Sequence, residues 1–441
     1  MNPSFLDTHL FETIGSGPHN ALERLHQFQL AAIRQTVAQA KKNSGFYKQH
    51  LKKICVENIS GFDEFTALPF TFAHHIQESS HDFLCVSQDE ISRIVTIETS
   101  GTTAFPKRMF FTDADLEQTI EFFSFVLSQM LNPGETALIL LPGNTPASAG
   151  DLLKTAMDRI GVNGIVSGII TDFCHTINTM NALRPSLIIG LPVQVLALCQ
   201  LSEKNNHIPD CVRDVILTSD YVSPFVKSRI RQILNCRVFD HYGMTETGFG
   251  GGIDCVEHKG YHLRETELFF EIIDPDTGRP ARKGQWGEIV VTTLGRQGMP
   301  LIRYRTGDIS RFLRDPCPCG SPFQRMDYIK NRYMHTIALP SGERFGMPDL
   351  DDMFFSIPGV VDFDAVLTQK QGIMNVQIVL KAFDLSMIHD IDINAVLPIS
   401  PIMENAVKAK DICFEFLPME TFKIKDTYTG KRRITDHTTT G

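Results

Sequence analysis

The chain has 441 residues, 42% of them apolar, and a formal net charge of −9. It is long enough for two or more structural units, and this charge argues against a dedicated surface for nucleic acids or anionic membranes. No apolar run reaches the ~18 residues of a membrane-spanning helix, and the first residues lack the regions of a signal peptide. We therefore expect a cytoplasmic protein with reduced thiols, apart from one cysteine cluster.

The first predicted element is an amphipathic helix from about Ala21 to Lys42, which Ser44-Gly45 ends. Its apolar residues at helical spacing are Leu22, Leu25, Phe28, Ala32 and Ile33. A second helix is expected after Asp113, which we predict to be its N-cap residue. The apolar stripe of that helix consists of Leu116, Ile120, Phe123, Leu127 and Met130.

Short apolar strands then alternate with helices. The strands are predicted at Ala137–Leu141, Leu187–Ile189, Val215–Leu217 and Arg237–Phe239, and the helices include Asp172–Leu183, Val193–Leu201 and Pro224–Leu234. Such alternation, with strands that are nearly all apolar, predicts an α/β fold with a mostly parallel sheet flanked by helices. Ligands of such sheets bind at the C-terminal ends of the strands.

The pattern changes after Leu268. Two strands, Leu268–Ile273 and Glu288–Leu294, are joined by the turn-rich stretch Asp274–Pro280, which predicts a small antiparallel element. Beyond about Lys330 we predict a compact α+β unit, with strands near Val361–Leu367, Asn375–Lys381 and Ile412–Leu417 and a helix near Ile391–Lys408. We therefore divide the chain into a large N-terminal domain, 1–330, and a small C-terminal domain, 331–441.

The stretch Thr99-Ser-Gly-Thr-Thr-Ala-Phe-Pro-Lys107 has the composition of a loop that wraps a polyphosphate. Glycine lets the backbone approach an anion, free N–H groups and hydroxyls can donate to it, and Lys107 adds a positive charge. The residue order differs from that of a Walker loop. Alone, the stretch fits a Ser/Thr-rich surface turn equally well.

Two later segments carry complementary chemistry. The predicted strand that begins at Arg237 runs into Tyr242-Gly-Met-Thr-Glu246, where Glu246 can hold Mg²⁺ and Thr245 can donate to a phosphate. The segment Leu301–Asp308 ends in a carboxylate suited to the two hydroxyls of a ribose. Taken singly, a Thr-Glu pair is usually a solvated turn and a Gly-Asp pair usually a hairpin corner.

In this combination and order the motifs resemble the adenylate-forming superfamily of acyl-CoA ligases, most closely its phenylacetate-CoA ligase branch. The resemblance extends from Phe46-Tyr47 to Gly430-Lys431. It implies that Glu246 and Thr245 contact Mg²⁺ and phosphate, and that Asp308 binds the ribose. The other residues it implies in ATP binding are Thr99, Ser100, Gly101, Thr102, Thr103 and Lys107 at the phosphates, Tyr242 and Gly243 at the adenine, and Arg332 near the hinge. Lys431 aligns with the lysine of a mobile C-terminal domain that assists adenylation.

This resemblance implies an AMP-forming ligase that adenylates an aromatic or similar carboxylic acid with ATP and passes the acyl group to CoA. Attack of a carboxylate on the α-phosphate brings two anions together, so the site must supply positive charge and geometry. The expected partners are the acid, ATP with Mg²⁺, and CoA, and a homodimer is left open.

Three departures from the family pattern keep other functions open. Ala104 replaces a glycine of the phosphate loop, the hinge segment Asn331–His335 lacks both usual acids, and Thr218-Ser-Asp220 replaces Ser-Gly-Glu. The altered hinge favours a second hypothesis, an adenylating enzyme whose acceptor is an amine, a carrier protein or another coenzyme. A third hypothesis is a non-catalytic nucleotide-binding homologue, against which the intact Lys107, Glu246, Asp308 and Lys431 argue.

Cysteines and histidines form one further cluster, made of Cys255, His258, His262, Cys317 and Cys319. Three thiols and one imidazole match the tetrahedral shell of a structural Zn²⁺. Some members of the similar family have a cysteine, a Gly-x-His and a Cys-Pro-Cys-Gly at these places, which favours His262 as the fourth ligand. His258, in Cys255-x2-His258, has the spacing that is commoner among zinc ligands. The alternative is two independent loops with free thiols.

Overall fold

The computed structural model describes residues 4–97, 106–370, 372–388, 392–423 and 432–438. The chain forms two compact units, each built from segments that are distant in the sequence. The first unit comprises residues 1–134, 143–163 and 241–329, and the second comprises 135–142, 164–240 and 330–441. One boundary follows residue 329, but the second unit also includes residues 164–240, so the division into domains 1–330 and 331–441 stays a prediction. None of the described helices is long and apolar enough to cross a membrane.

Helices make up much of the first unit. They are α1 (Asp7–Ile14), α2 (Ala21–Asn43), α3 (Gly45–His50), α4 (Phe62–Thr66), α5 (Ala73–Ser79), α6 (Asp113–Ser128) and α7 (Ala149–Arg159). The predicted helix at 21–42 is confirmed as α2, and Ser44 ends it because its side chain accepts a hydrogen bond from the Tyr47 amide and so begins α3. Leu22 does not belong to the buried stripe, since it is 45% exposed while its neighbour Ala21 is buried.

The N-terminus of α6 differs from the prediction by one residue. Thr112, and not Asp113, is the N-cap: its hydroxyl accepts a hydrogen bond from the Asp115 amide, and its own amide donates to the Asp115 carboxylate. This reciprocal capping satisfies two backbone donors that would otherwise lack partners. The Asp115 carboxylate also accepts hydrogen bonds from the amides of Gln297 and Gly298, so it ties α6 to the segment that follows β11.

Two antiparallel strand groups of the first unit carry residues of the predicted nucleotide site. β1 (Arg93–Ile97) pairs with β2 (Lys107–Phe111), and Lys107 is therefore the first residue of a strand. β10 (Leu268–Ile273), β11 (Gly287–Thr293) and β12 (Tyr304–Ser310) form a meander, which confirms the predicted antiparallel element. The third strand was not expected, because its polar, glycine-containing sequence lacks a strand pattern.

Three shorter strands continue antiparallel from the end of β7 (Arg237–Tyr242). They are β8 (Gly252–Asp254), β9 (Tyr261–Leu263) and β13 (Arg325–Met326), and neighbours in this order are paired. Residues 241 and 242 of β7 lie in the first unit, whereas residues 237–240 lie in the second.

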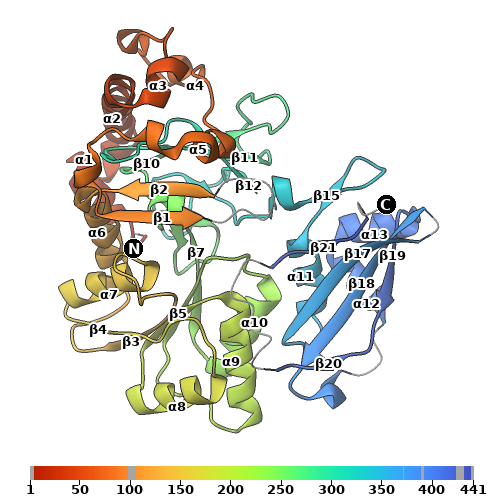
Figure 1. Ribbon diagram of the computed structural model, residues 1–441. Coiled ribbons are helices and arrows are strands. Elements are labelled where there is room, and N and C mark those ends of the chain that lie inside the picture. Colours follow the sequence, from red (N-terminus) through yellow and green to blue (C-terminus); the bar gives the residue numbers. More distant parts are fainter. Residues whose placement is uncertain (1–3, 98–105, 371, 389–391, 424–431, 439–441) are drawn as a thin grey trace. The chain divides into compact units, whose positions relative to one another are not determined.

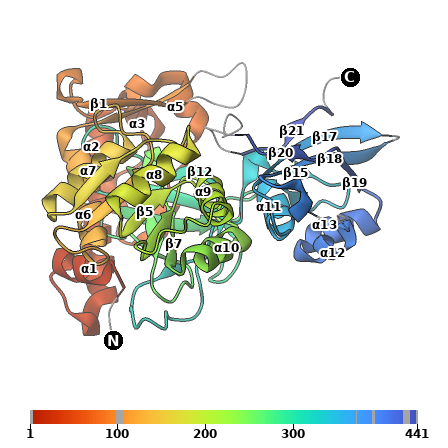
Figure 2. The ribbon, with the colours of Figure 1, turned by 90° about the horizontal axis from the view of Figure 1, so that it is seen from below.

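The parallel sheet of the second unit confirms the predicted α/β fold (Figures 1 and 2). Its strand order is β7, β6 (Asp214–Leu217), β5 (Leu187–Gly190), β3 (Thr136–Leu140) and β4 (Asn163–Val166), and β7, β6, β5 and β3 run parallel. The strands alternate in sequence with α8 (Phe173–Leu183), α9 (Pro192–Lys204) and α10 (Pro224–Leu234). Strand β4 and helix α7 were not predicted, although the buried residues Leu152, Leu153, Ala156 and Met157 of α7 recur at helical spacing.

The remainder of the second unit is an α+β layer. β18 (Ile373–Ala382) pairs with β17 (Asp362–Lys370), β19 (Ile412–Phe416) and the short β20 (Glu420–Thr421), and β17 also pairs with β21 (Thr435–Asp436). The other elements are β14 (Asn331–Arg332), β15 (Ile337–Ala338), β16 (Arg344–Phe345) and helices α11 (Met347–Phe355), α12 (Ile393–Val396) and α13 (Pro401–Lys408). The stretch predicted near 391–408 as one helix is helical but divided in two, because Pro398 and Pro401 lack amide hydrogens and a 3₁₀ turn separates α12 from α13.

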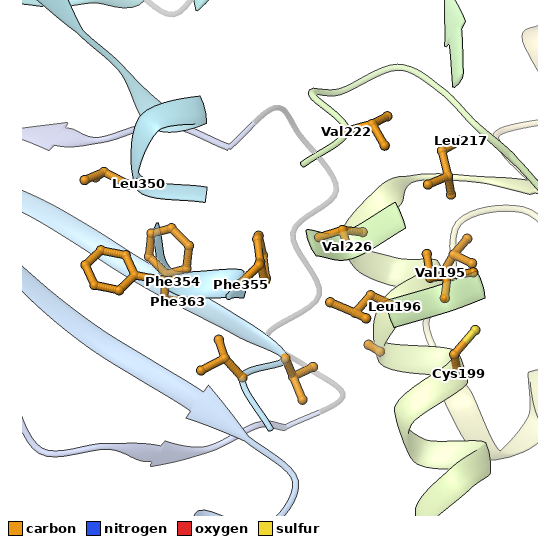
Figure 3. Packing of buried hydrophobic residues seen from close by; sticks show 14 of the residues in the cluster. Val195, Leu196, Cys199, Leu217, Val222, Val226, Leu350, Phe354, Phe355 and Phe363 are labelled. Atoms are coloured by element: carbon orange, nitrogen blue, oxygen red, sulfur yellow. The ribbon is translucent and has the colours of Figure 1, made fainter. Parts of the chain in front are cut away.

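One apolar core connects the two parts of the second unit. Figure 3 shows side chains from α9 and α10, such as Val195 and Val226, together with Phe354 and Phe355 of α11. The side-chain amide of Gln200 on α9 also donates a hydrogen bond of 3.2 Å to the Val360 carbonyl. Residues 164–240 and 330–441 thus share buried surface within this unit.

Candidate functional site

Lys107, Glu246 and Tyr304 meet in the first unit. Lys107 is the first residue of β2, Glu246 lies in a 3₁₀ turn after β7 (Thr245–Thr247), and Tyr304 is the first residue of β12. The Lys107 ammonium donates to Glu246 Oε1 and, at 3.1 Å, to the Tyr304 hydroxyl, which in turn donates to Glu246 Oε1 at 3.1 Å. The Lys107 and Glu246 side chains are only 12% and 5% exposed. The three groups therefore form a triangle of hydrogen bonds that is almost completely shielded from solvent.

The 3₁₀ turn that carries Glu246 is held from two sides. Arg296 Nη1 donates to the Glu246 carbonyl at 2.7 Å, and the Thr119 hydroxyl of α6 donates to the Gly248 carbonyl at 2.9 Å. Gly248 has φ +71°, a conformation that favours glycine. Burial lowers the pKa of Arg296 to about 10, and its guanidinium lies over the Phe111 ring. The sequence did not identify Arg296 and Tyr304 as partners of Glu246, because no local motif marks either residue for that role.

A second pair, Tyr242 and Asp308, connects the same two segments. The Tyr242 hydroxyl donates a 3.0 Å hydrogen bond to Asp308 Oδ2, and both residues are buried. Asp308 lies within β12 and is not at a hairpin corner. Gly243 follows Tyr242 in the chain. A Cβ atom at position 243 would lie 2.0 Å from the Phe249 carbonyl oxygen, so no larger residue fits there. The residues expected at the adenine and at the ribose are therefore in contact.

The other residues expected in the nucleotide site are placed less closely or not at all. Thr245 is half-buried in the same turn as Glu246. Arg332 lies on β14 in the second unit, whereas the Tyr242–Asp308 pair belongs to the first unit. The expected phosphate-binding residues Thr99, Ser100, Gly101, Thr102 and Thr103, and the expected catalytic residue Lys431, lie outside the described residues.

Arg432, the residue after Lys431, is anchored in the second unit. Its guanidinium donates to Asp351 on α11 and, at 2.9 Å, is paired with Asp362 on β17. It also lies over the Phe363 ring, 4.4 Å from the ring centre. Burial raises the pKa of Asp351 to about 7, against the opposing effect of the Arg432 charge. The chain is therefore fixed one residue after the predicted catalytic lysine.

Cys255, His262, Cys317 and Cys319 form a buried group whose four donor atoms all lie within 4.8 Å of one another. The Sγ atoms of Cys255 and Cys317 are 3.6 Å apart, and Cys319 Sγ is 3.6 Å from His262 Nε2. A tetrahedral zinc with Zn–S of about 2.3 Å and Zn–N of about 2.0 Å puts neighbouring donors roughly 3.5–3.8 Å apart. The donor set and its spacing therefore fit Zn²⁺.

The two histidines left open by the sequence have different surroundings. His262 Nε2 faces Cys319, and burial lowers the pKa of His262 to about 4, which keeps the imidazole neutral as a metal ligand must be. His258 lies outside the group, with its Nδ1 3.1 Å from the Asp254 carboxylate. The structure therefore brings three cysteines and His262 together and does not include His258.

A family model described as AMP-binding enzyme matches residues 33–298, which is more than half of the chain. The chain belongs to this AMP-binding enzyme family. The matched region contains Lys107, Tyr242 and Glu246, and it ends before Asp308 and Tyr304. The expected superfamily is therefore confirmed, together with the α/β fold.

Individual relatives of this AMP-binding enzyme include two phenylacetate-coenzyme A ligases. The ligase of Thermus thermophilus is 25% identical over 364 residues, which cover 80% of each chain. That of Pseudomonas putida is 25% identical over 320 residues, which cover 71% of each chain. Among solved structures, 2-hydroxyisobutyryl-CoA ligase in complex with 2-HIB-AMP has a TM-score of 0.81 at 18% identity, covering 94% of this chain and 90% of that chain. At this identity the similarity concerns the fold.

Proposed function

We propose that the protein is an AMP-forming ligase that adenylates an aromatic or similar carboxylic acid and transfers the acyl group to CoA. One observation carries the proposal: two residue pairs join β7 and the turn after it to β12, Tyr242 with Asp308 and Glu246 with Tyr304. Tyr304 and Asp308 are four residues apart on β12, which is at most about 13 Å at the rise of a regular strand, and the irregular pairing with β11 between them shortens this distance. That separation suits a ligand with a nucleoside at one end and an anionic group at the other.

The chemistry assigns a task to each group. Bound Mg²⁺ would neutralise phosphate oxygens, and Glu246 is the carboxylate that would hold it. Lys107 would supply positive charge to the phosphates, while Asp308 accepts hydrogen bonds from the ribose hydroxyls and Tyr242 lies against the adenine. A substrate carboxylate oxygen then forms a bond to the α-phosphorus as the bond to pyrophosphate breaks, and Lys431 stabilises the charge that develops.

The second half-reaction would form the thioester. The sulfur of CoA attacks the acyl carbon and AMP leaves. The names of the two relatives support an aromatic acid and CoA as substrates. A different acceptor, such as an amine, a carrier protein or another coenzyme, is the second candidate because the segment Asn331–His335 lacks the acids of the family hinge. Within this segment, the Asn331 side chain donates a 3.2 Å hydrogen bond to Asp349 on α11.

Acid-dependent exchange between ATP and pyrophosphate tests this function. Purified protein should incorporate labelled pyrophosphate into ATP in the presence of Mg²⁺ and one member of a panel of aromatic and short aliphatic acids. Mass spectrometry after addition of CoA should then show the acyl-CoA product. Exchange without acyl-CoA favours the second candidate, and no exchange with any acid, while ATP still binds, favours a non-catalytic nucleotide-binding protein.

Replacing Glu246 by glutamine should raise the Mg²⁺ concentration required for half-maximal exchange by about tenfold. The variant keeps a side chain of the same shape but loses the negative charge that attracts the cation. The measurement is a Mg²⁺ titration at saturating ATP and acid. An unchanged titration curve would remove the metal-binding role from Glu246.

We also propose that Cys255, His262, Cys317 and Cys319 hold a structural Zn²⁺. Four protein ligands complete a tetrahedral shell and leave no position for a reacting water, so the metal would stabilise the fold. It would join the loop after β8 to the loop between β12 and β13. The second of these loops also contacts α1, because the Ser321 hydroxyl donates a 2.7 Å hydrogen bond to the buried Asp7.

A further inference from the structure

We propose that Tyr304 is a positioning residue of the nucleotide site: its hydroxyl holds the Glu246 carboxylate in place when Lys107 turns from that carboxylate to the phosphates of ATP. This inference rests on the proposed function and adds a residue to its machinery. The observation is the triangle in which one hydroxyl contacts both members of an ion pair, each at 3.1 Å.

Tyr304 is well suited to a fixed position. Its side chain is 1% exposed, so the ring has little freedom to move. The backbone on both sides of it is held by Thr71, whose amide donates to the Arg303 carbonyl at 3.0 Å and whose carbonyl accepts from the Arg305 amide at 2.9 Å. The hydroxyl therefore has a defined place, whereas the long Lys107 side chain has several rotatable bonds.

The ion pair makes the binding of ATP and Mg²⁺ interdependent. If Mg²⁺ alone bound to Glu246, the Lys107 ammonium would lose its buried counter-ion. If a phosphate alone bound to Lys107, the Glu246 carboxylate would lose its counter-ion in the same way. Both losses are avoided when ATP and Mg²⁺ bind together, because each side chain then gains a new partner of opposite charge. The two ligands should therefore bind cooperatively.

Throughout this exchange the Tyr304 hydroxyl can remain on Glu246. A neutral donor orients the carboxylate and leaves its negative charge available for the cation. Arg296, a cation beside this turn, hydrogen-bonds the Glu246 carbonyl. Tyr304 therefore gives the Glu246 carboxylate an uncharged partner beside the Lys107 ammonium.

The test is a thermal-shift titration of wild-type protein and the Tyr304→Phe variant with ATP, Mg²⁺ and both. In the wild type, the two ligands together should raise Tm by more than the sum of their separate effects. In Tyr304→Phe, the Mg²⁺ concentration for half-maximal stabilisation at saturating ATP should rise about tenfold, which corresponds to the loss of one hydrogen bond to a charged group. The response to ATP without Mg²⁺ should stay unchanged.

Tyr328→Phe is the matched control. It removes a hydroxyl that donates to another buried carboxylate, Asp254, at 3.0 Å in the same unit. This variant should lower Tm in the absence of ligands and leave the Mg²⁺ concentration at half-maximal stabilisation unchanged. An equal shift in both variants would mean that loss of packing explains the effect, and would overturn the inference.

Two further outcomes separate this inference from the proposed function. A normal wild-type response with the same Mg²⁺ dependence in Tyr304→Phe overturns the role of Tyr304 alone. No stabilisation of the wild type by ATP with Mg²⁺ overturns the nucleotide site itself. If Tyr304→Phe does not fold, Lys107→Gln tests the exchange: Mg²⁺ alone should then stabilise the protein more than it stabilises the wild type, and an equal or smaller effect contradicts the exchange.

Discussion

Replacing Lys431 by alanine should slow acid-dependent adenylate formation by about two orders of magnitude, while the affinity for ATP stays nearly unchanged. The reason is that the charge is needed where negative charge develops in the transition state, and not in the bound ground state. Single-turnover formation of the acyl adenylate measures the rate, and equilibrium binding of ATP measures the affinity. Equal losses of rate and affinity would contradict a transition-state role.

Arg433→Ala is the control for this variant. Arg433 is exposed and carries the same charge two residues further along the chain. Its removal should change the rate less than twofold, because an exposed and screened charge contributes little. A loss as large as that of Lys431→Ala would indicate a general effect of the basic run. Arg432 is not a suitable control, because its removal would take away the guanidinium that pairs with both buried aspartates, Asp351 and Asp362.

Replacing Cys317 by serine should remove zinc from the protein and lower Tm by roughly 5–10 °C. Loss of one thiolate weakens a site whose binding energy also stabilises the fold, and about 2–4 °C is expected per kcal/mol for a cooperative unit of roughly 150–250 residues. The protein that remains folded should keep most of its activity per molecule, since none of the four donors belongs to the nucleotide site. Elemental analysis and thermal unfolding are the measurements.

Two histidine variants give this prediction its control. His262→Ala should lose zinc as Cys317→Ser does, whereas His258→Ala should retain about one zinc per chain, because its imidazole lies on Asp254 outside the group. Protein prepared without chelators that contains no metal would contradict the zinc site. An unchanged Tm in Cys317→Ser would contradict its structural role.

The sequence predicted the parts of this protein that depend on local order. Strands such as Val215–Leu217 are apolar throughout, and the structure buries them in a parallel sheet, as their alternation with helices indicates. The helix Pro224–Leu234 has the predicted bounds because proline begins it and its apolar residues recur at helical spacing. The motifs that contain Lys107 and Glu246 were also visible, because their residue types stand next to one another in the chain.

Tertiary structure decided what depends on residues far apart in the sequence. Arg296 and Tyr304 come 50 and 58 positions after Glu246, and no local pattern marks either as its partner. Asp308 lies in a strand because β11 pairs beside it, although Gly307-Asp308 alone resembles a hairpin corner. His262 and not His258 joins the cysteines because β9 carries it to a loop more than 50 residues later. Local periodicity specifies helices and strands, whereas a site is assembled only when burial and strand pairing bring distant side chains within hydrogen-bonding distance.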